Sequence, residues 1–232
     1  MTAWEGTSMG WFDGMGAIIS ALFANDAWTL GDALRANPQA LWTLGFLVTV
    51  LGGLAVMAIY RAVPFIERYF EPTIMVVSYL TIGGIIFMGV IDRFFLNGQP
   101  PWSTTVPPFL FLIMTWVGCS YNVKLRTHLA FAEFRTIMPR TGQFACLLLD
   151  AVLWLGFAWI VIVTSTQETI GAAANFRFMA GTDNVMQWWF LISVPLAWLL
   201  LSGRVFQNLA DDLRNYRRGD VMIRQAVIGG DA

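Results

Sequence analysis

Long runs of apolar residues alternate with short polar segments along most of the chain. Five runs are long enough to cross the ~30 Å hydrocarbon layer of a bilayer, which takes about 20 residues of helix. They are residues 41–60, 73–91, 106–123, 144–163 and 185–203. Helix is the required form, because lipid offers no partners for open backbone groups. The pattern predicts an all-α integral membrane protein with about five transmembrane helices in a domain spanning 41–203.

The composition supports a membrane protein and narrows its chemistry. Hydrophobic residues make up 57% of the 232 residues and charged residues only 12%, whereas about 25% charge is usual in soluble domains. A formal net charge of −1 argues against a nucleic-acid partner. Two Cys and one His leave little material for a metal cluster or a disulfide framework.

The basic residues predict an orientation, because cytoplasmic loops carry the excess of Lys and Arg. Eleven of the fourteen basic residues lie in segments 61–72, 124–143 and 204–232, while Arg35, Arg93 and Arg177 lie in the alternate segments. We therefore expect a periplasmic N-terminus and a cytoplasmic C-terminus.

The segments outside the apolar runs predict interfacial helices. The N-terminal segment 1–40 carries more acidic than basic residues, and it contains a short apolar run, 15–24, with helical spacing. That run is too short to span, so we expect it to lie on the outer interface or to pack against the bundle. Residues 126–139 mix an apolar face with basic side chains, which predicts a cytoplasmic arm helix lying at the headgroups. Residues 204–232 form a charged tail, expected to be cytoplasmic.

The sequence offers little that could support catalysis. It contains no phosphate loop of the GxxxxGK type and no HExxH motif, and one histidine cannot supply two axial ligands to a haem. We therefore expect no enzyme activity and no cofactor. Asp150 is the one acid well inside a predicted span, where a carboxylate costs about 2.5–3.5 kcal/mol. It is either an ion- or proton-coupling group or, as we favour, a structural partner of a neighbouring polar or basic side chain.

Short motifs between Asp92 and Leu200 resemble a known family, the small membrane (Q) subunit of TRAP transporters (DctQ-like; tripartite ATP-independent periplasmic systems). In this family an Arg closes the first common helix, a Trp precedes the next, and small residues are followed by a basic residue and a His-Ile/Leu pair. The last common helix carries a Pro. The matching residues here are Arg93, Trp102, Gly118 with Ser120, Arg126, His128 with Leu129, and Pro195. The family core has four helices, so 41–60 is predicted to be an extra N-terminal span.

The resemblance implies a function in a bacterial inner membrane. The chain would scaffold a large membrane subunit that carries the substrate and sodium sites, and a periplasmic binding protein would deliver an organic acid or similar solute. Residues Arg93, Trp102, Gly118, Ser120, Arg126 and His128 would then contact partners or support the scaffold. Gly118 and Ser120 could instead pack within the subunit, and the basic residues near 126 could simply bind anionic lipid. A non-catalytic membrane anchor of a respiratory or redox complex is the alternative function.

Overall fold

The computed structural model describes residues 8–96, 98–126 and 135–222. Within them, five helical segments are long and apolar enough to cross a membrane: 38–62, 64–95, 102–125, 140–174 and 188–218. The predicted all-α membrane fold is thus confirmed. The helical elements are α1 (Ser8–Phe23), α2 (Ala27–Ala36), α3 (Pro38–Leu47), the π-helical turn η1 (Val48–Gly52), α4 (Gly53–Ala62), α5 (Pro64–Phe95), α6 (Trp102–Leu125), α8 (Arg140–Ala174), α9 (Trp188–Leu191) and α10 (Ser193–Arg218).

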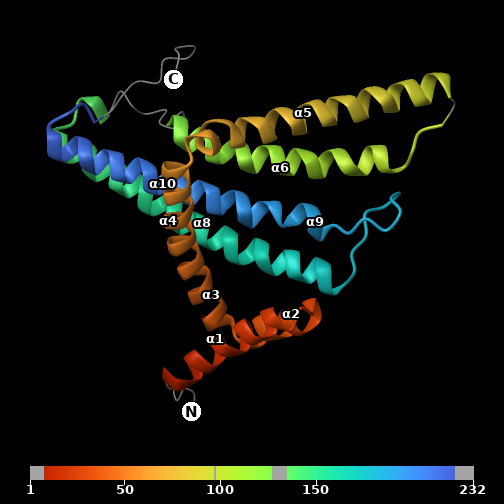
Figure 1. The fold of residues 1–232 in the computed structure, drawn as a ribbon, viewed down its shortest axis with the longest axis horizontal. Coiled ribbons are helices and arrows are strands. Elements are labelled where there is room, and N and C mark those ends of the chain that lie inside the picture. The colour runs from red at the N-terminus through yellow and green to blue at the C-terminus, as the bar shows by residue number, and fades with distance from the viewer. Residues whose placement is uncertain (1–7, 97, 127–134, 223–232) are drawn as a thin grey trace.

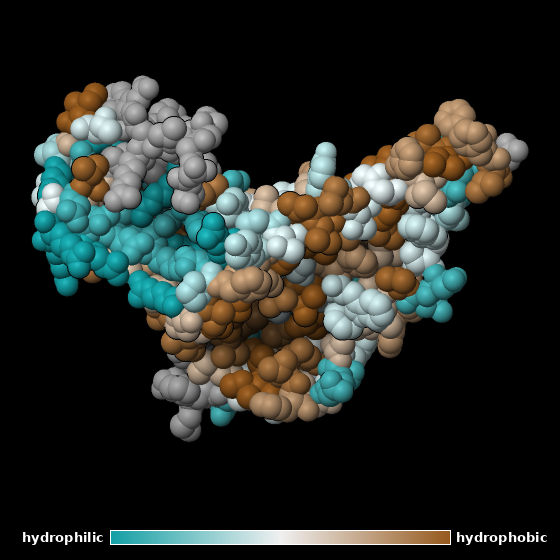
Figure 2. Space-filling view, turned by 45° about the horizontal axis from the view of Figure 1, so that its top comes forward, coloured by the Kyte–Doolittle hydropathy of each residue, from teal (hydrophilic) through white to brown (hydrophobic). Residues whose placement is uncertain are grey.

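The long helices α5, α6, α8 and α10 lie side by side, and the run α3–η1–α4 lies across them (Figure 1). The α5–α6 hairpin packs through α6 on α10, and α10 packs on α8. The continuous run α3–η1–α4 crosses α8 and α10 at a steep angle (Figure 1). Trp198 of α10 lies at the centre of the apolar core, with the ring of Trp116 from α6 at 5.4 Å and that of Phe157 from α8 at 5.1 Å. Polar surface gathers at the end where α8 begins and α10 ends (Figure 2).

Glycines allow the crossing helix to approach α10 closely. A Cβ atom on Gly203 of α10 would lie 2.8 Å from Cβ of Val56, and one on Gly53 of α4 would lie 2.9 Å from Cβ of Ser202. Such separations are too short for real side chains, so the backbones touch where small residues meet, as is common between helices in lipid.

Replacing Gly203 by alanine should therefore destabilise the protein by about 1–3 kcal/mol, the usual cost of overpacking. Gly84→Ala on α5 is the matched control, because nothing lies within 4 Å of a Cβ at that position. Gly84→Ala should be neutral or slightly stabilising, since alanine is the better helix former. Thermal unfolding of both variants in detergent, followed by tryptophan fluorescence, measures the difference. Equal melting temperatures would mean that the α4–α10 contact adapts without cost.

The N-terminal segment folds into two helices that pack on the bundle. Asn25, with φ of 53°, reverses the chain between α1 and α2, and the Asp26 carboxylate caps α2 by accepting bonds from the backbone N–H groups of Trp28 and Thr29. These bonds lower the pKa of Asp26. A cluster of apolar side chains joins α1, α2, α3 and α8: Ile18, Leu34, Leu41 and Val163. Part of the 15–24 run thus packs on the bundle, while Ile19, Leu22 and Phe23 are exposed, so a position on the outer interface stays a prediction.

Several helix boundaries differ from the predicted segments. The connection predicted at 61–72 is nearly absent, because α5 already begins at Pro64, where proline is favourable in the first helical turn. Helix α10 continues without a break past residue 203 to Arg218, so the predicted boundary between span and tail lies inside one helix. Most of the predicted arm at 126–139, residues 127–134, lies outside the described residues.

Candidate functional site

A buried ion pair joins two helices that are far apart in the sequence. Arg204 of α10 and Glu71 of α5 are both fully buried. The guanidinium Nε donates to Oε1 at 3.2 Å, and Nη2 donates to Oε2 at 2.6 Å. This two-point geometry is the strong arrangement for an arginine and a carboxylate.

Two further helices contribute to the same carboxylate. The hydroxyl groups of Tyr60 from α4 and Ser120 from α6 both donate to Oε1 of Glu71, at 3.1 and 2.6 Å. The Tyr60 ring also lies 3.8 Å from Cζ of Arg204, a cation–π contact. The group of Arg204, Glu71, Tyr60 and Ser120, here called the charge cluster, therefore joins α4, α5, α6 and α10.

The remaining donors of Arg204 are also used. Its Nη1 donates to Oε1 of Gln207 at 2.8 Å and to Oε1 of Glu67 at 3.3 Å, and its Nη2 donates to the carbonyl oxygen of Glu67 at 3.0 Å. Lys124 Nζ donates to that same carbonyl at 3.1 Å. A buried charge is tolerated only when it is paired and hydrogen-bonded. The charge cluster meets this condition and is therefore suited to holding helices together.

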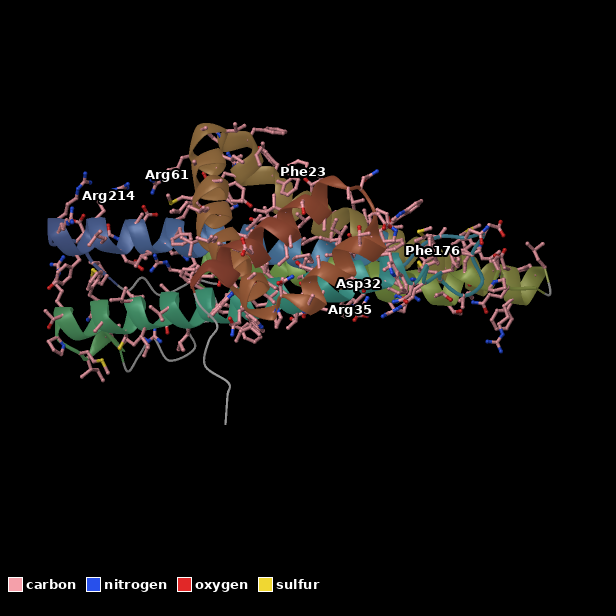
Figure 3. All side chains as sticks on the ribbon, turned by 90° about the horizontal axis from the view of Figure 1, so that it is seen from below. Phe23, Asp32, Arg35, Arg61, Phe176 and Arg214 are labelled. Carbon is pink, nitrogen blue, oxygen red and sulfur yellow. The ribbon has the colours of Figure 1, made fainter. Side chains whose placement is uncertain are left out.

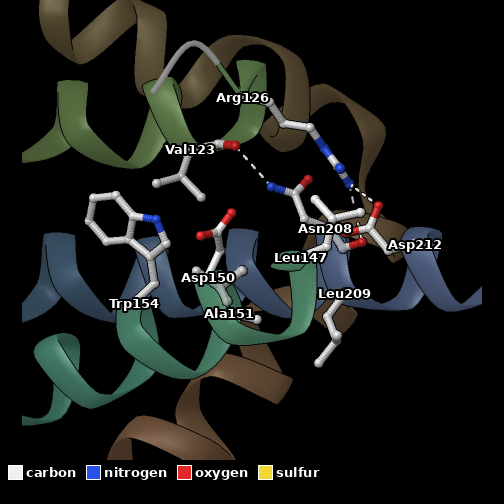
Figure 4. Close-up of a pocket in the computed structure, with 10 residues that line it drawn as sticks. Val123, Arg126, Leu147, Asp150, Ala151, Trp154, Asn208, Leu209 and Asp212 are labelled. Carbon is white, nitrogen blue, oxygen red and sulfur yellow. Dashed lines mark hydrogen bonds and ion pairs between the residues drawn. The ribbon is translucent and has the colours of Figure 1, made fainter. Parts of the chain in front are cut away.

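A second polar group lies where α6 ends against α8 and α10 (Figure 4). Arg126 ends α6 with a left-handed backbone, φ 57°, and its Nη2 lies 2.7 Å from Oδ1 of Asp212 and 3.3 Å from the carbonyl oxygen of Asn208. The Asn208 amide donates to the carbonyl oxygen of Val123 at 2.8 Å. The crevice between these residues measures about 30 Å³, room for roughly one water molecule.

Asp150 lines this crevice and has a basic partner. Nη2 of Arg135 donates to its Oδ1 at 3.0 Å, and Nη1 of the same residue contacts the other oxygen. The hydrogen bond and the charge of Asp150 raise the pKa of Arg135. Asp150 is thus paired with a basic side chain of the same chain, as a structural role requires, and the choice between the two roles stays a prediction.

The other predicted site residues are spread over the molecule. Gly118 and Ser120 are buried inside the chain, and a Cβ on Gly118 would lie 3.5 Å from Cε of Met75 on α5. This favours packing within the subunit over contact with a partner. Arg93 and Trp102 are exposed at the α5–α6 turn, and His128 lies outside the described residues.

Sequence reasoning missed three members of the charge cluster. Glu71 fell in a predicted loop, Arg204 was counted as a positive-inside charge, and Tyr60 closed a predicted span. A usable signal was present, because Glu67 and Glu71 are acids four residues apart at a span boundary that is otherwise basic. Residues with this spacing share one helix face, so a basic partner on another helix was to be expected.

Comparison with family models gives one match. The model described as "Tripartite ATP-independent periplasmic transporters, DctQ component" matches residues 82–215, more than half of the chain. The chain belongs to this family. Comparison with curated proteins finds no match.

The matched region of this DctQ-family protein includes only part of the charge cluster. Ser120 and Arg204 lie inside the matched region, whereas Tyr60 and Glu71 precede it. The crossing run α3–η1–α4 also precedes it, and whether that run is an addition to the family core stays a prediction. The charge cluster therefore joins α4, which lies before the matched region, to α6 and α10, which lie within it.

Proposed function

We propose that this chain scaffolds the large membrane subunit of a TRAP transporter during sodium-coupled uptake of an organic acid or similar solute. A periplasmic binding protein delivers the solute, and the solute and sodium sites lie in the large subunit. The family match supports a small TRAP subunit, and the pairing of buried charges supports a static role. Among the described residues the buried charged side chains are Glu71, Arg204 and Asp212, and each is paired within the chain.

Copurification and uptake measured together test this proposal. The full chain, expressed together with the other subunits of the transporter and extracted in mild detergent, should copurify with a much larger multi-span protein. Vesicles containing both proteins should take up solute only when the binding protein and an inward sodium gradient are present. Removing this chain should abolish uptake. A haem or quinone signal in the purified protein would instead support the redox-anchor alternative, which the family match disfavours.

The proposal includes an orientation with the N-terminus in the periplasm and the C-terminus in the cytoplasm. The bias of basic residues toward segments 61–72, 124–143 and 204–232 supports it. A reporter active only in the periplasm should be active at the N-terminus and inactive at the C-terminus. The opposite result at the N-terminus would mean that α3–η1–α4, despite its length, does not cross the bilayer.

A further inference from the structure

A polar crevice separate from the charge cluster lies between the end of α6 and the last turns of α10. It measures about 360 Å³, room for several water molecules. Its lining combines three cationic side chains and one carboxylate with two apolar side chains: Lys124, Arg126, Arg214, Asp211, Val221 and Met222. Val221 is 69% exposed and Met222 only 4%, so apolar surface borders the charged part.

The charges around this crevice leave one positive charge uncompensated. Arg126 pairs with Asp212 at 2.7 Å, and Arg214 pairs with Asp211 at 3.4 Å. Lys124 has no carboxylate oxygen within 4.0 Å among the described residues, and it donates instead to the carbonyl oxygen of Glu67. Of the two paired carboxylates, Asp211 lines the crevice and Asp212 lies beside it. The charges that act on Lys124 from α5 and α10 cancel, because Glu67 and Glu71 offset Arg68 and Arg204. The net charge is therefore +1, which one phosphodiester would neutralise.

The surroundings suggest the source of such a group. Arg214 extends from α10, and Arg61 extends from the end of α4 (Figure 3). Basic pockets between transmembrane helices on the cytoplasmic side are typical binding sites for anionic headgroups. The pairing of cations with exposed apolar surface at Val221 matches a molecule that carries both phosphate and acyl chains.

We infer that this crevice binds a phosphate group, supplied by the headgroup of an anionic phospholipid. Lys124 and Arg214 provide the attraction, and Val221 contacts the adjoining acyl chain. The site differs from general attraction of basic residues to the inner leaflet, because it requires particular cations rather than any cation at this end of the molecule. It rests on the proposed orientation but not on the transport function.

Native mass spectrometry of the purified full chain tests the site. The protein is exchanged into micelles containing equal amounts of phosphatidylglycerol and phosphatidylcholine, and the retained lipid is counted. The wild-type protein should retain phosphatidylglycerol preferentially. Lys124→Gln and Arg214→Gln should each reduce that retention about fivefold, the effect expected for one charge near an anionic headgroup. Lys124→Arg keeps the charge and should therefore retain the lipid. This result would show that position 124 tolerates replacement.

The matched control is Arg61→Gln, which removes the same charge from a residue that does not line the crevice. It should leave retention unchanged. An equal loss in Arg61→Gln, or equal retention of phosphatidylcholine by the wild type, would overturn the proposal.

A second experiment adds inorganic phosphate at millimolar concentration as a competitor of the lipid. If it displaces the lipid from the wild type but its binding is lost in Lys124→Gln, the phosphate site stands with a soluble anion as its ligand.

Discussion

Arg204→Met should lower the stability of the protein more than any other single change considered. The variant leaves the Glu71 carboxylate fully buried without its counter-ion, and breaking a buried ion pair in this way costs about 3–5 kcal/mol. Whole proteins are stable by about 5–15 kcal/mol, so we expect a large loss of folded protein in the membrane. Glu71→Gln should have a smaller effect, because Arg204 stays buried and charged but keeps its ion pair with Glu67.

The double variant Arg204→Met, Glu71→Gln distinguishes two costs. One is the loss of the ion pair, and the other is the burial of a single charge without its partner. With both charges removed, no buried ion lacks a partner, so the loss should be clearly smaller than the sum of the two single losses. Arg217→Met is the control, since Arg217 is an exposed arginine on the same helix. Melting temperatures in detergent give the comparison. Additive losses would show that the two side chains do not act as a pair.

Tyr60→Phe tests how much α4 contributes to the stability of the charge cluster. The substitution removes the bond from the hydroxyl to Glu71 but keeps the ring against Arg204. One hydrogen bond is worth about 0.5–1.5 kcal/mol net, and somewhat more when its partner is charged. The expected loss is therefore well below that of Arg204→Met.

The sequence was sufficient to predict the membrane-spanning helices, because each span can be recognised from its own residues. A 20-residue apolar run identifies a span with no knowledge of its neighbours, and all five predicted spans correspond to helices. The steep crossing of α3–η1–α4 was not predictable in this way. It depends on contacts such as that of Gly203 with Val56, which join residues 147 positions apart, and no local pattern specifies such a pairing.

The polar contacts were only partly predictable for a related reason. Asp150 was singled out because an acid inside a predicted span is unusual, and Arg126 because it matches the family pattern. Their partners, Asp212 and Arg135, lie in segments that looked like ordinary charged surface. Sequence shows which charges lie near the membrane, but the pairs form between helices whose relative rotation is set by packing.

Arg126→Lys should reduce solute uptake while the protein remains at normal levels in the membrane. The arginine Nη2 reaches both Asp212 and the carbonyl oxygen of Asn208, which fixes the end of α6 against α10. Lysine keeps the charge but is a single point donor on a flexible stem, so it does not reproduce the planar fork. The family resemblance extends this prediction to His128→Ala, although that residue lies outside the described structure.

Asp212→Asn separates this pairing from simple anchoring in anionic lipid. If Arg126 holds α6 against α10, removing the charge of Asp212, whose side chain is only 5% exposed, should reduce uptake as Arg126→Lys does. If Arg126 serves only the lipid surface, removing a nearby acid should leave uptake unchanged or strengthen membrane attachment, and Arg126→Lys should be neutral. Uptake by cells expressing the complete transporter, normalised to the amount of each variant in the membrane, is the measurement. Wild-type uptake in both variants would leave lipid anchoring as the role of Arg126.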